Sequence, residues 1–322
     1  MIRSLLLLSV LLYAPLSPGV ELFQDSSQNY GFKLSNVAST EKPLIISNVF
    51  IATPSYRIPQ WRLAQWGTRY NLVSAVEESL PGGIRSLSNE GKTVLLHPGG
   101  LAGEGVTLEV KGRAEYPERL RKRGEPWPHL LVEQRLKPVA CADWKALDFH
   151  LEFFVEKCEP ATDLTQDPGL HTAQVGVFFT VHNINRKSPD YRDMIWFGLP
   201  VYDVRFGMSP GHQALDIGKG DATGKFICTL EGSRFYEEEI FPGKWHTLAA
   251  DLIPQLKDAL AASQVHGHFT NSTLDDLRFT SFNLGWEVPG IYDCSIHLRK
   301  LSLQGTPKKS PGRTVKGKGK IP

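Results

Sequence analysis

Apolar and polar residues alternate with a period of two along much of this chain, and this pattern constrains its fold more than any other feature. The segment His129–Leu136 alternates in this way, and Glu133 falls on its less apolar side. Leu147–Cys158 repeats the pattern, and His171–Asn185 is the richest in β-branched and aromatic residues. Side chains of an extended strand point to opposite faces in turn, so each segment predicts a strand with one face on a core. Pro43–Ala52, rich in isoleucine and valine, predicts a further, buried strand.

One segment near the end of the chain has helical spacing instead. In residues 253–269, apolar and small side chains recur at the interval of a helical turn, with Pro254 near the start and Gly267 near the end. Elsewhere, 29 glycines and 22 prolines divide the sequence into short stretches. Many short strands without alternating helices predict an all-β fold, namely an antiparallel two-sheet sandwich with one late helix.

Both ends of the 322-residue chain differ from its middle. Residues 1–19 combine Arg3, an apolar run and then proline and small residues. They predict a cleaved signal peptide, hence a secreted or cell-envelope protein with no transmembrane segment in the mature chain. Residues 306–322 hold six lysines and arginines and no acid, which predicts a basic disordered tail. Removing these six charges from the net charge of +2 leaves −4, so the overall charge does not indicate nucleic-acid binding.

Residues 20–305 are predicted to form a single β-sandwich domain, because no low-complexity linker interrupts them. The alternative is two stacked sandwiches divided within Arg113–Pro128. That stretch is charged and contains three prolines, so it is predicted to be an exposed connection.

Four cysteines lie within the predicted domain. Cys141 and Cys158 flank one strand-like segment, while Cys228 and Cys294 each lie inside a β-type run. They allow three disulfide pairings in an exported protein, and buried thiols are the alternative. None forms a C-x-x-C pair and no histidine cluster accompanies them, which argues against a zinc site.

The closing block, residues 282–303, reads FNLGWEVPGIYDCSIHLRKLSL. It resembles the final strands of secreted jelly-roll and concanavalin-like sandwiches in carbohydrate-active proteins, where a Gly-Trp turn precedes an alternating strand with an acidic residue. The resemblance implies a jelly-roll (concanavalin-like) fold and a polysaccharide or oligosaccharide as the partner.

Catalytic signatures of those proteins are absent from the sequence. The E-x-D-x-x-E motif of laminarinase-like hydrolases is missing, as are the R-x-E-L-R and Q-I-H signatures of sandwich alginate lyases. The general motifs G-x-x-x-x-G-K-[ST], G-x-S-x-G and H-E-x-x-H are missing too. The sequence therefore leaves open a glycoside hydrolase, a polysaccharide lyase and a non-catalytic binder.

Residue types supply candidates for catalysis. Glycoside hydrolysis needs two carboxyl groups, one of them protonated, whereas a lyase needs a base and a neutralising cation. The candidate catalytic residues are Glu133, His171, Tyr202 and Asp203. For each of them the alternative is a structural role in an ion pair, at a strand start or in the core.

The stretch Trp196–Phe226 mixes aromatic and charged side chains with glycines and prolines, which predicts loops at the rim of a sheet. Aromatic faces stack on sugar rings, and polar side chains bind the hydroxyl groups. The candidate ligand-binding residues are Trp196, Arg205, Gln213, Lys219, Trp286 and Glu287. Glu133 is predicted to share one groove with Tyr202, Asp203 and Arg205.

The sequence contains no cofactor motif, and its one candidate metal is a structural calcium ion held by Glu21, Asp25 and Asp293. Two hypotheses about function follow. The first is a secreted protein that binds or cleaves a glycan in a groove on one sheet. The second is a cell-surface structural or interaction domain without catalytic activity.

Overall fold

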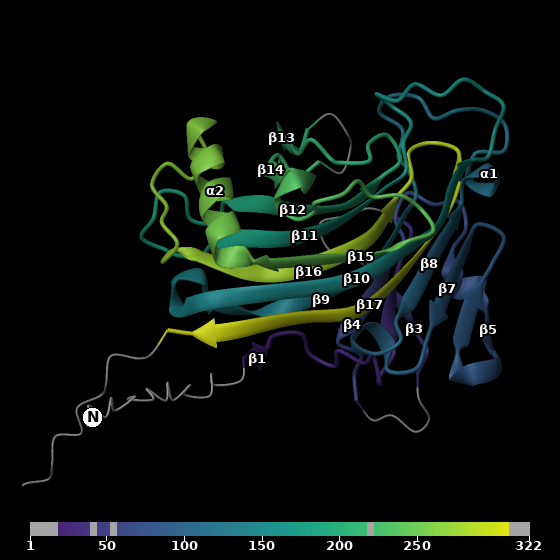
Figure 1. The fold of residues 1–322 in the computed structure, drawn as a ribbon, viewed down its shortest axis with the longest axis horizontal. Helices are drawn as coiled ribbons and strands as arrows, with labels where there is room; N and C mark the ends of the chain where they lie inside the picture. Colours follow the sequence, from purple (N-terminus) through teal and green to yellow (C-terminus); the bar gives the residue numbers. More distant parts are fainter. Residues whose placement is uncertain (1–18, 39–43, 52–56, 218–221, 309–322) are drawn as a thin grey trace, which may run out of the picture.

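Two β-sheets pack face to face in the computed structural model, which describes residues 19–38, 44–51, 57–217 and 222–308 (Figure 1). We call the sheet of eight strands sheet A. Its strands in spatial order are β15 (Trp245–Asp251), β10 (Trp144–Pro160), β17 (Tyr292–Pro307), β8 (Val106–Lys111), β7 (Lys92–Leu96), β6 (Arg85–Ser88) and β5 (Val76–Ser79), with β1 (Val20–Glu21) pairing with β17.

The sheet of nine strands is sheet B. Its strands in spatial order are β13 (His212–Leu215), β14 (Phe226–Thr229), β12 (Met194–Asp203), β11 (Gln174–Asn183), β16 (Leu277–Glu287), β9 (His129–Ala140), β4 (Trp61–Ala64), β2 (Phe32–Ser35) and β3 (Ile45–Val49). Within the described ranges, β2 pairs with β4 and β12 with β14 in parallel, and the remaining pairs are antiparallel.

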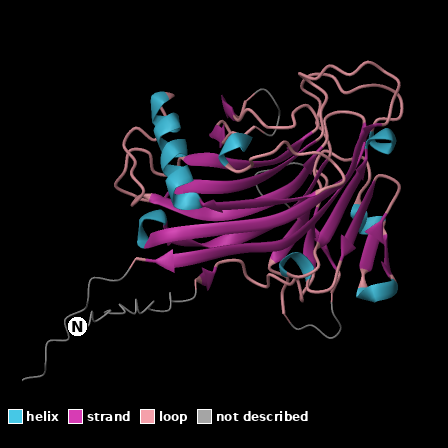
Figure 2. Cartoon of the chain, in the orientation of Figure 1, coloured by secondary structure: helices cyan, strands magenta, loops and turns pink. Residues whose placement is uncertain are grey.

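Helices are few beside the strands (Figure 2). α1 (Gly112–Glu115) is a single turn, and the 3₁₀ turns are η1 (Leu72–Ser74), η2 (Pro81–Gly83), η3 (Gly100–Ala102), η4 (Cys141–Asp143) and η5 (Gly232–Arg234). The long helix is α2 (Leu252–Val265), where the sequence predicts it. The carboxylate of Asp251 caps its first turn by accepting a hydrogen bond from the backbone N–H of Ile253 (3.0 Å). Its buried side chains pack against β10, β12 and β14, so it closes one edge of the sandwich (Figure 1).

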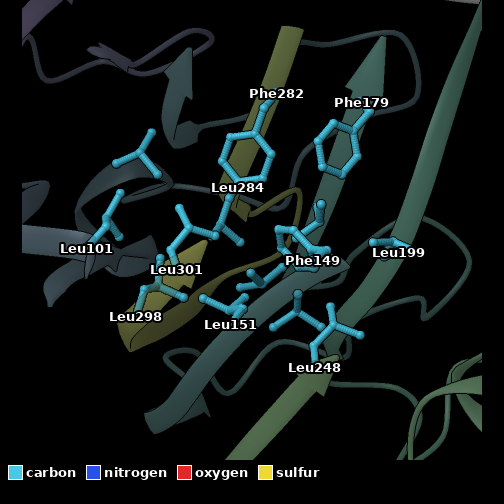
Figure 3. Close-up of a cluster of buried hydrophobic side chains, with 14 of the residues drawn as sticks. Leu101, Phe149, Leu151, Phe179, Leu199, Leu248, Phe282, Leu284, Leu298 and Leu301 are labelled. Carbon is cyan, nitrogen blue, oxygen red and sulfur yellow. The ribbon is translucent and has the colours of Figure 1, made fainter. Parts of the chain in front are cut away.

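The inward faces of both sheets form one hydrophobic core that runs from Phe23 to Leu303. Aromatic rings link the layers: Phe149 of β10 lies edge-on to Phe179 of β11 at 5.8 Å and close to Phe282 of β16 at 6.1 Å (Figure 3). Leucines from both sheets, including Leu284 and Leu298, fill the space around these rings. The fold is the antiparallel two-sheet sandwich predicted from the alternating segments, with the jelly-roll architecture that the resemblance of the closing block implies, so the predicted fold class is confirmed.

Two local expectations are wrong. The segment predicted as a buried strand, Pro43–Ala52, contributes β3 at the edge of sheet B, where Ile45 is exposed because only one side of the strand is paired. The charged stretch Arg113–Pro128 buries the side chains of Glu115 and Arg121 and is therefore more than an exposed connection. Glu115 lies 3.6 Å from the ammonium group of Lys92, an inward residue of β7.

The ends of the chain extend beyond the described residues. The predicted signal peptide lies outside them except for Gly19, and of the predicted tail only residues up to 308 are described. β17 continues to Pro307, two residues past the predicted end of the domain. Neither helix in the described ranges is long and apolar enough to cross a membrane.

Candidate functional site

The outward face of sheet B carries a row of side chains that crosses nearly the whole sheet. Strand register places the row's members opposite one another, from Lys33 through Arg62, Glu133, Asn283, Phe178 and Gly198 to Thr229. Residues opposite one another on paired strands share a face, and the alternate residues of these strands form the core. We call this set the Glu133 row. It combines cationic, acidic, amide, aromatic and hydroxyl groups in one line.

Glu133 is the rigid centre of this row. The residue is only 7% exposed, and its carboxylate forms an ion pair with the guanidinium of Arg62 on the neighbouring strand. Burial raises the pKa of Glu133 because it disfavours the charged form, while the positive charge of Arg62 acts in the opposite direction. The pair fixes both side chains at the surface of β4 and β9.

Phe178 forms an aromatic platform in the same row. A Cβ atom added to Gly176 or Gly198 would lie 3.0 Å and 2.7 Å from its ring, so the ring lies over the backbone of these two glycines. The side chain remains half-buried, and Trp196 stands edge-on to it at 6.3 Å. The indole N–H of Trp196 donates to the hydroxyl of Thr223 at 3.0 Å, which holds the ring upright beside the platform. Two aromatic side chains are therefore fixed on one sheet face.

A second polar row crosses sheet B nearer to the end of the sandwich. Register places His129, Glu287, Gln174 and Asp203 opposite one another, and we call them the Glu287 row. The Glu287 carboxylate accepts from the indole N–H of Trp127 at 3.2 Å and lies 3.5 Å from the His129 ring. His129, Glu287 and Gln174 are each four residues along their strands from the corresponding positions of the Glu133 row, which corresponds to roughly 13 Å. Asp203 is five residues beyond Gly198 because β12 contains an extra residue.

Small and apolar residues form the strip between the two rows. Register aligns Leu131, Gly285, Gly176 and Pro200 there. Gly285 and Gly176 carry no side chains of their own, and the Phe178 ring reaches over Gly176 at the border of the strip. The arrangement thus places two polar rows on either side of a low strip, with Phe178 and Trp196 at one border. It suits an extended ligand with many hydroxyl groups, since polar and flat apolar surfaces alternate along it.

Asp203 and Arg205 lie at the end of the Glu287 row. The guanidinium of Arg205 donates from Nε to Asp203 at 2.9 Å and from a terminal nitrogen to Gln174 at 3.4 Å. The carboxylate of Asp203 also accepts from the hydroxyl of Thr172 at 3.1 Å. The structure therefore brings Asp203, Arg205 and Glu287 onto the same face as Glu133, as the predicted groove requires.

Tyr202, by contrast, points into the core, and the reason is a β-bulge. Val175 is opposite Tyr202 while Gly176 is opposite Pro200, so Val201 is an extra residue in β12. A bulge re-aims the side chains that follow it. The ring of Tyr202 consequently contacts buried Trp286 at 6.1 Å and lies apart from the predicted groove.

Trp286 and His171 are also placed away from the outer face. The indole of Trp286 is fully buried and donates to the carbonyl of Leu108 in sheet A at 2.9 Å, so it joins the two sheets. His171 is buried beneath a loop. Its Nε2 donates to the carbonyl of Arg121 at 2.8 Å, and its Nδ1 accepts from the backbone N–H of Asp167 at 2.9 Å. Both ring nitrogens of His171 therefore have structural partners.

One of the two remaining candidates lies at the edge of sheet B. Gln213 is an exposed residue of the edge strand β13, and its register with Cys228 and Phe197 puts it on the opposite face from Trp196. Lys219 lies outside the described residues.

The site contains residues that the sequence analysis did not single out as ligand-binding. These are Arg62, Gln174, Phe178 and Asn283. A usable signal existed for Gln174 and Phe178, because the alternation of His171–Asn185 puts them on one face. Arg62 and Asn283 become neighbours of Glu133 only through strand order, which the sequence does not display.

The three residues proposed as calcium ligands each have a hydrogen-bond partner in the protein. Glu21 accepts from the backbone N–H of Phe23 at 2.8 Å, and Asp25 accepts from the N–H groups of Asn29 and Tyr30. Asp293 lies by the backbone N–H of Arg113 at 3.3 Å. Across the described ranges no group of three or more His, Cys, Asp or Glu side chains is arranged to hold a metal ion.

A shallow open depression lies elsewhere, at the N-terminal arm. It is lined by Gln24, Asp25, Asn29, Tyr30, Arg57, Ile58 and Gln60. Arg57 donates to the Tyr30 hydroxyl at 2.8 Å, and residues 52–56 beside it are outside the described ranges. The aromatic and carboxylate groups of the two rows are not part of it, so we place the candidate site on sheet B.

Comparisons with known proteins yield structural neighbours only. Neither the protein-family models nor the curated proteins include a match to this sequence. Among solved structures, the endoglucanase cel12A from Rhodothermus marinus is 9% identical, covers 73% of this chain and 97% of its own, and has a TM-score of 0.36. A native family 12 xyloglucanase from Bacillus licheniformis is 10% identical, with coverages of 72% and 97% and a TM-score of 0.38.

A third neighbour is the xyloglucanase domain of NopAA, a type three effector from Sinorhizobium fredii, in complex with cellobiose. It is 11% identical, covers 72% of this chain and 96% of its own, and has a TM-score of 0.37. By their names, these neighbours are an endoglucanase and two xyloglucanases. Identities and TM-scores this low assign no activity to the present chain, so its function must be argued from its own side chains.

Proposed function

We propose that this protein binds a polysaccharide chain across the outer face of sheet B and does not cleave it. The observation that carries the proposal is the Phe178 platform over Gly176 and Gly198, flanked by Trp196 and continued by polar side chains of the Glu133 row. A pyranose ring presents an apolar C–H face and a polar rim. The Phe178 platform matches the apolar face, and the polar side chains of the Glu133 row match the rim.

The positions of the carboxylates favour binding over hydrolysis. Retaining and inverting glycosidases hold their two carboxyl groups about 5 Å and about 6.5–9.5 Å apart. Register puts Asn283 and Arg62 opposite Glu133, and Glu287 is four residues further along β16. The backbones of Glu133 and Glu287 are then roughly 14 Å apart. Both carboxylates are also engaged, one with Arg62 and the other with Trp127 and His129.

The residues considered for a lyase are separated as well. Tyr202 is turned into the core, and both ring nitrogens of His171 are hydrogen-bonded to backbone groups. Neither can take a proton from a sugar ring at the outer face. The cation expected to neutralise a uronate, Arg205, is already paired with Asp203. Binding therefore accounts for more of the arrangement than elimination does.

The Phe178→Ala variant tests the platform directly. We expect it to weaken binding of the best ligand found on a glycan array about 10- to 100-fold, because losing a stacked Phe side chain removes about 1.5–3 kcal/mol. The matched control is Phe154→Ala, which removes a half-buried Phe from the outer face of sheet A. Isothermal titration with neutral β-linked glucans and with acidic polyuronates measures both variants and identifies the class of glycan.

Two results would contradict the platform. If the parent binds a glycan and Phe178→Ala binds it equally well, the ligand lies elsewhere on the molecule. If the parent binds no glycan on the array, the alternative of a structural or interaction domain gains.

The Glu133→Gln variant separates binding from catalysis. It keeps the size of the side chain, and we expect the parent and the variant to release neither reducing ends nor unsaturated products from any glycan that the parent binds. Turnover in the parent that disappears in Glu133→Gln, but persists in Glu109→Gln on the other sheet, would show that Glu133 is a catalytic acid instead.

We also propose that the chain is exported and that its mature form begins near Val20. The cut expected from the sequence falls directly before β1, whose residue Val20 is opposite Gly305 of β17, so removal of residues 1–19 leaves this pairing intact. Intact-mass measurement of the protein recovered from the cell envelope or medium should give a chain without those residues. A mass that includes Met1 contradicts export by cleavage.

A further inference from the structure

Cys158 and Cys294 are directly opposite each other in sheet A, near the end of β10 and the start of β17. They belong to β10 and β17, which pair antiparallel, with Lys157 opposite Ser295 on one side and Glu159 opposite Asp293 on the other. Both cysteines are buried and present as free thiols. Side chains at directly opposite positions of two paired strands point to the same face, so the two cysteines are neighbours in space.

The surroundings of the two thiols agree with this placement. Burial raises the pKa of the Cys294 thiol and the neighbouring Cys158 raises it further, and burial together with Cys158 also raises the pKa of Tyr202 in sheet B. The Cys294 thiol also lies 3.7 Å from the carbonyl of Val110. Opposite residues of an antiparallel pair have Cα atoms about 4.5–5.5 Å apart, within the range of about 4.4–6.8 Å that a disulfide spans.

The other two cysteines lack such a partner. Cys228 is on β14, and Cys141 begins η4 directly after β9. In sheet B, β14 and β9 are separated by β12, β11 and β16, which places these cysteines roughly 19 Å apart across the sheet. No disulfide can join them without rebuilding the sheet.

We propose that Cys158 and Cys294 form a cross-strand disulfide when the chain folds under oxidising conditions, and that Cys141 and Cys228 stay reduced. The oxidant is a disulfide, either that of a thiol oxidoreductase or of oxidised glutathione. The thiolate of one cysteine attacks that disulfide and releases one thiol, leaving a mixed disulfide. The second thiolate attacks the mixed disulfide, closes the Cys158–Cys294 bond and releases the second thiol.

The exchange balances in both electrons and protons. Two electrons pass from the cysteine pair to the oxidant's disulfide, and the two protons lost by the cysteines are taken up by its sulfurs. Because both thiols are buried in the folded protein, the exchange takes place before β10 and β17 finish packing. This inference does not depend on glycan binding or on export.

Refolding with glutathione tests the pairing. The full chain, reduced and unfolded, is refolded with oxidised and reduced glutathione, unfolded again without reductant and alkylated, and its peptides are mapped by mass spectrometry. We expect one linked peptide pair, containing Cys158 and Cys294 and lighter by two hydrogen atoms, with Cys141 and Cys228 alkylated. Four alkylated cysteines, or any other linked pair, would overturn the proposal.

If refolding yields are low, thermal unfolding provides a second test of the same pairing. We expect a reductant to lower the Tm of the oxidised parent by about 5–10 °C, because a disulfide that closes a long loop stabilises a domain of this size by that amount. The matched control Cys228→Ala should keep this sensitivity to reductant. Cys158→Ala and Cys294→Ala should each lose it, and a reductant-dependent shift that survives in them would refute the pairing.

Discussion

Glu115→Gln is expected to lower the free energy of unfolding by about 3–5 kcal/mol, as is typical when one partner of a buried ion pair is removed. The side chains of Glu115 and Lys92 have almost no exposure, and their charged groups lie 3.6 Å apart. The Glu115 carboxylate also accepts from the backbone N–H of Arg69 at 2.8 Å and from the hydroxyl of Thr68. The neutral amide leaves the Lys92 ammonium buried without a counter-ion.

A matched control lies in the same stretch of chain, Arg113–Pro128. Glu125 forms an ion pair with Arg119 at the surface, at 2.7 Å, and Glu125→Gln should leave stability nearly unchanged because water screens this pair. Urea unfolding of both variants measures the difference. The double variant Lys92→Met/Glu115→Gln should recover much of the loss, since it removes both buried charges together. Equal stability of Glu115→Gln and Glu125→Gln would show that the buried pair is not needed for stability.

The same lysine predicts a pH dependence of defined sign. Burial lowers the pKa of Lys92 from 10.5 to about 8, although Glu115 acts in the opposite direction. Between these two values the unfolded chain binds the proton and the folded chain does not, so the Lys92 contribution to stability rises with pH. The free energy of unfolding of the parent, minus that of Lys92→Met, should therefore increase between about pH 8 and 10. A flat or falling difference would mean that the folded-state pKa is not lowered.

The sandwich could be predicted because strand alternation is local. The segments His129–Leu136, Leu147–Cys158 and His171–Asn185 each show in their own residues which side faces the core, and all three became central strands. The capped helix was visible for the same reason. Pro43–Ala52 was assigned as buried because apolar content does not reveal whether a strand lies at the centre or the edge of a sheet.

The candidate site was only partly predictable, because it depends on strand order and on one bulge. Glu133, Glu287 and Asp203 reach one face through pairings between segments far apart in the chain. The sequence predicts Tyr202 in the groove, but the extra residue at Val201 turns its side chain into the core. No residue type in β12 indicates this bulge. A lysine at an inward position of a strand, such as Lys92, indicates a buried acidic partner. That partner is Glu115, which the sequence pattern did not identify.

Trp286→Ala should lower the free energy of unfolding by about 3–5 kcal/mol, the usual cost of deleting a large buried aromatic side chain. The indole fills the space between the sheets beside Tyr202 and bonds the carbonyl of Leu108, so its loss leaves a cavity and an unpaired acceptor. Adjacent Gly285 is also closely packed: its φ is +153°, and a Cβ there would lie 2.2 Å from the carbonyl oxygen of Leu130 in sheet B and 3.1 Å from the side chain of Leu108 in sheet A. The Gly-Trp pair of the closing block is thus a packing element between the two sheets.

Trp196→Ala is also a tryptophan-to-alanine substitution, but it should affect glycan binding more than stability. Trp196 is half-buried on the outer face beside Phe178, and its truncation should cost less than about 1 kcal/mol of stability. It should weaken glycan binding about tenfold or more, whereas folded Trp286→Ala should keep the parent's affinity. Thermal unfolding and isothermal titration on both variants measure the two quantities side by side. A Trp286→Ala protein that stays as stable as the parent but loses its ligand would move the binding site from the outer face of sheet B to the interior of the sandwich.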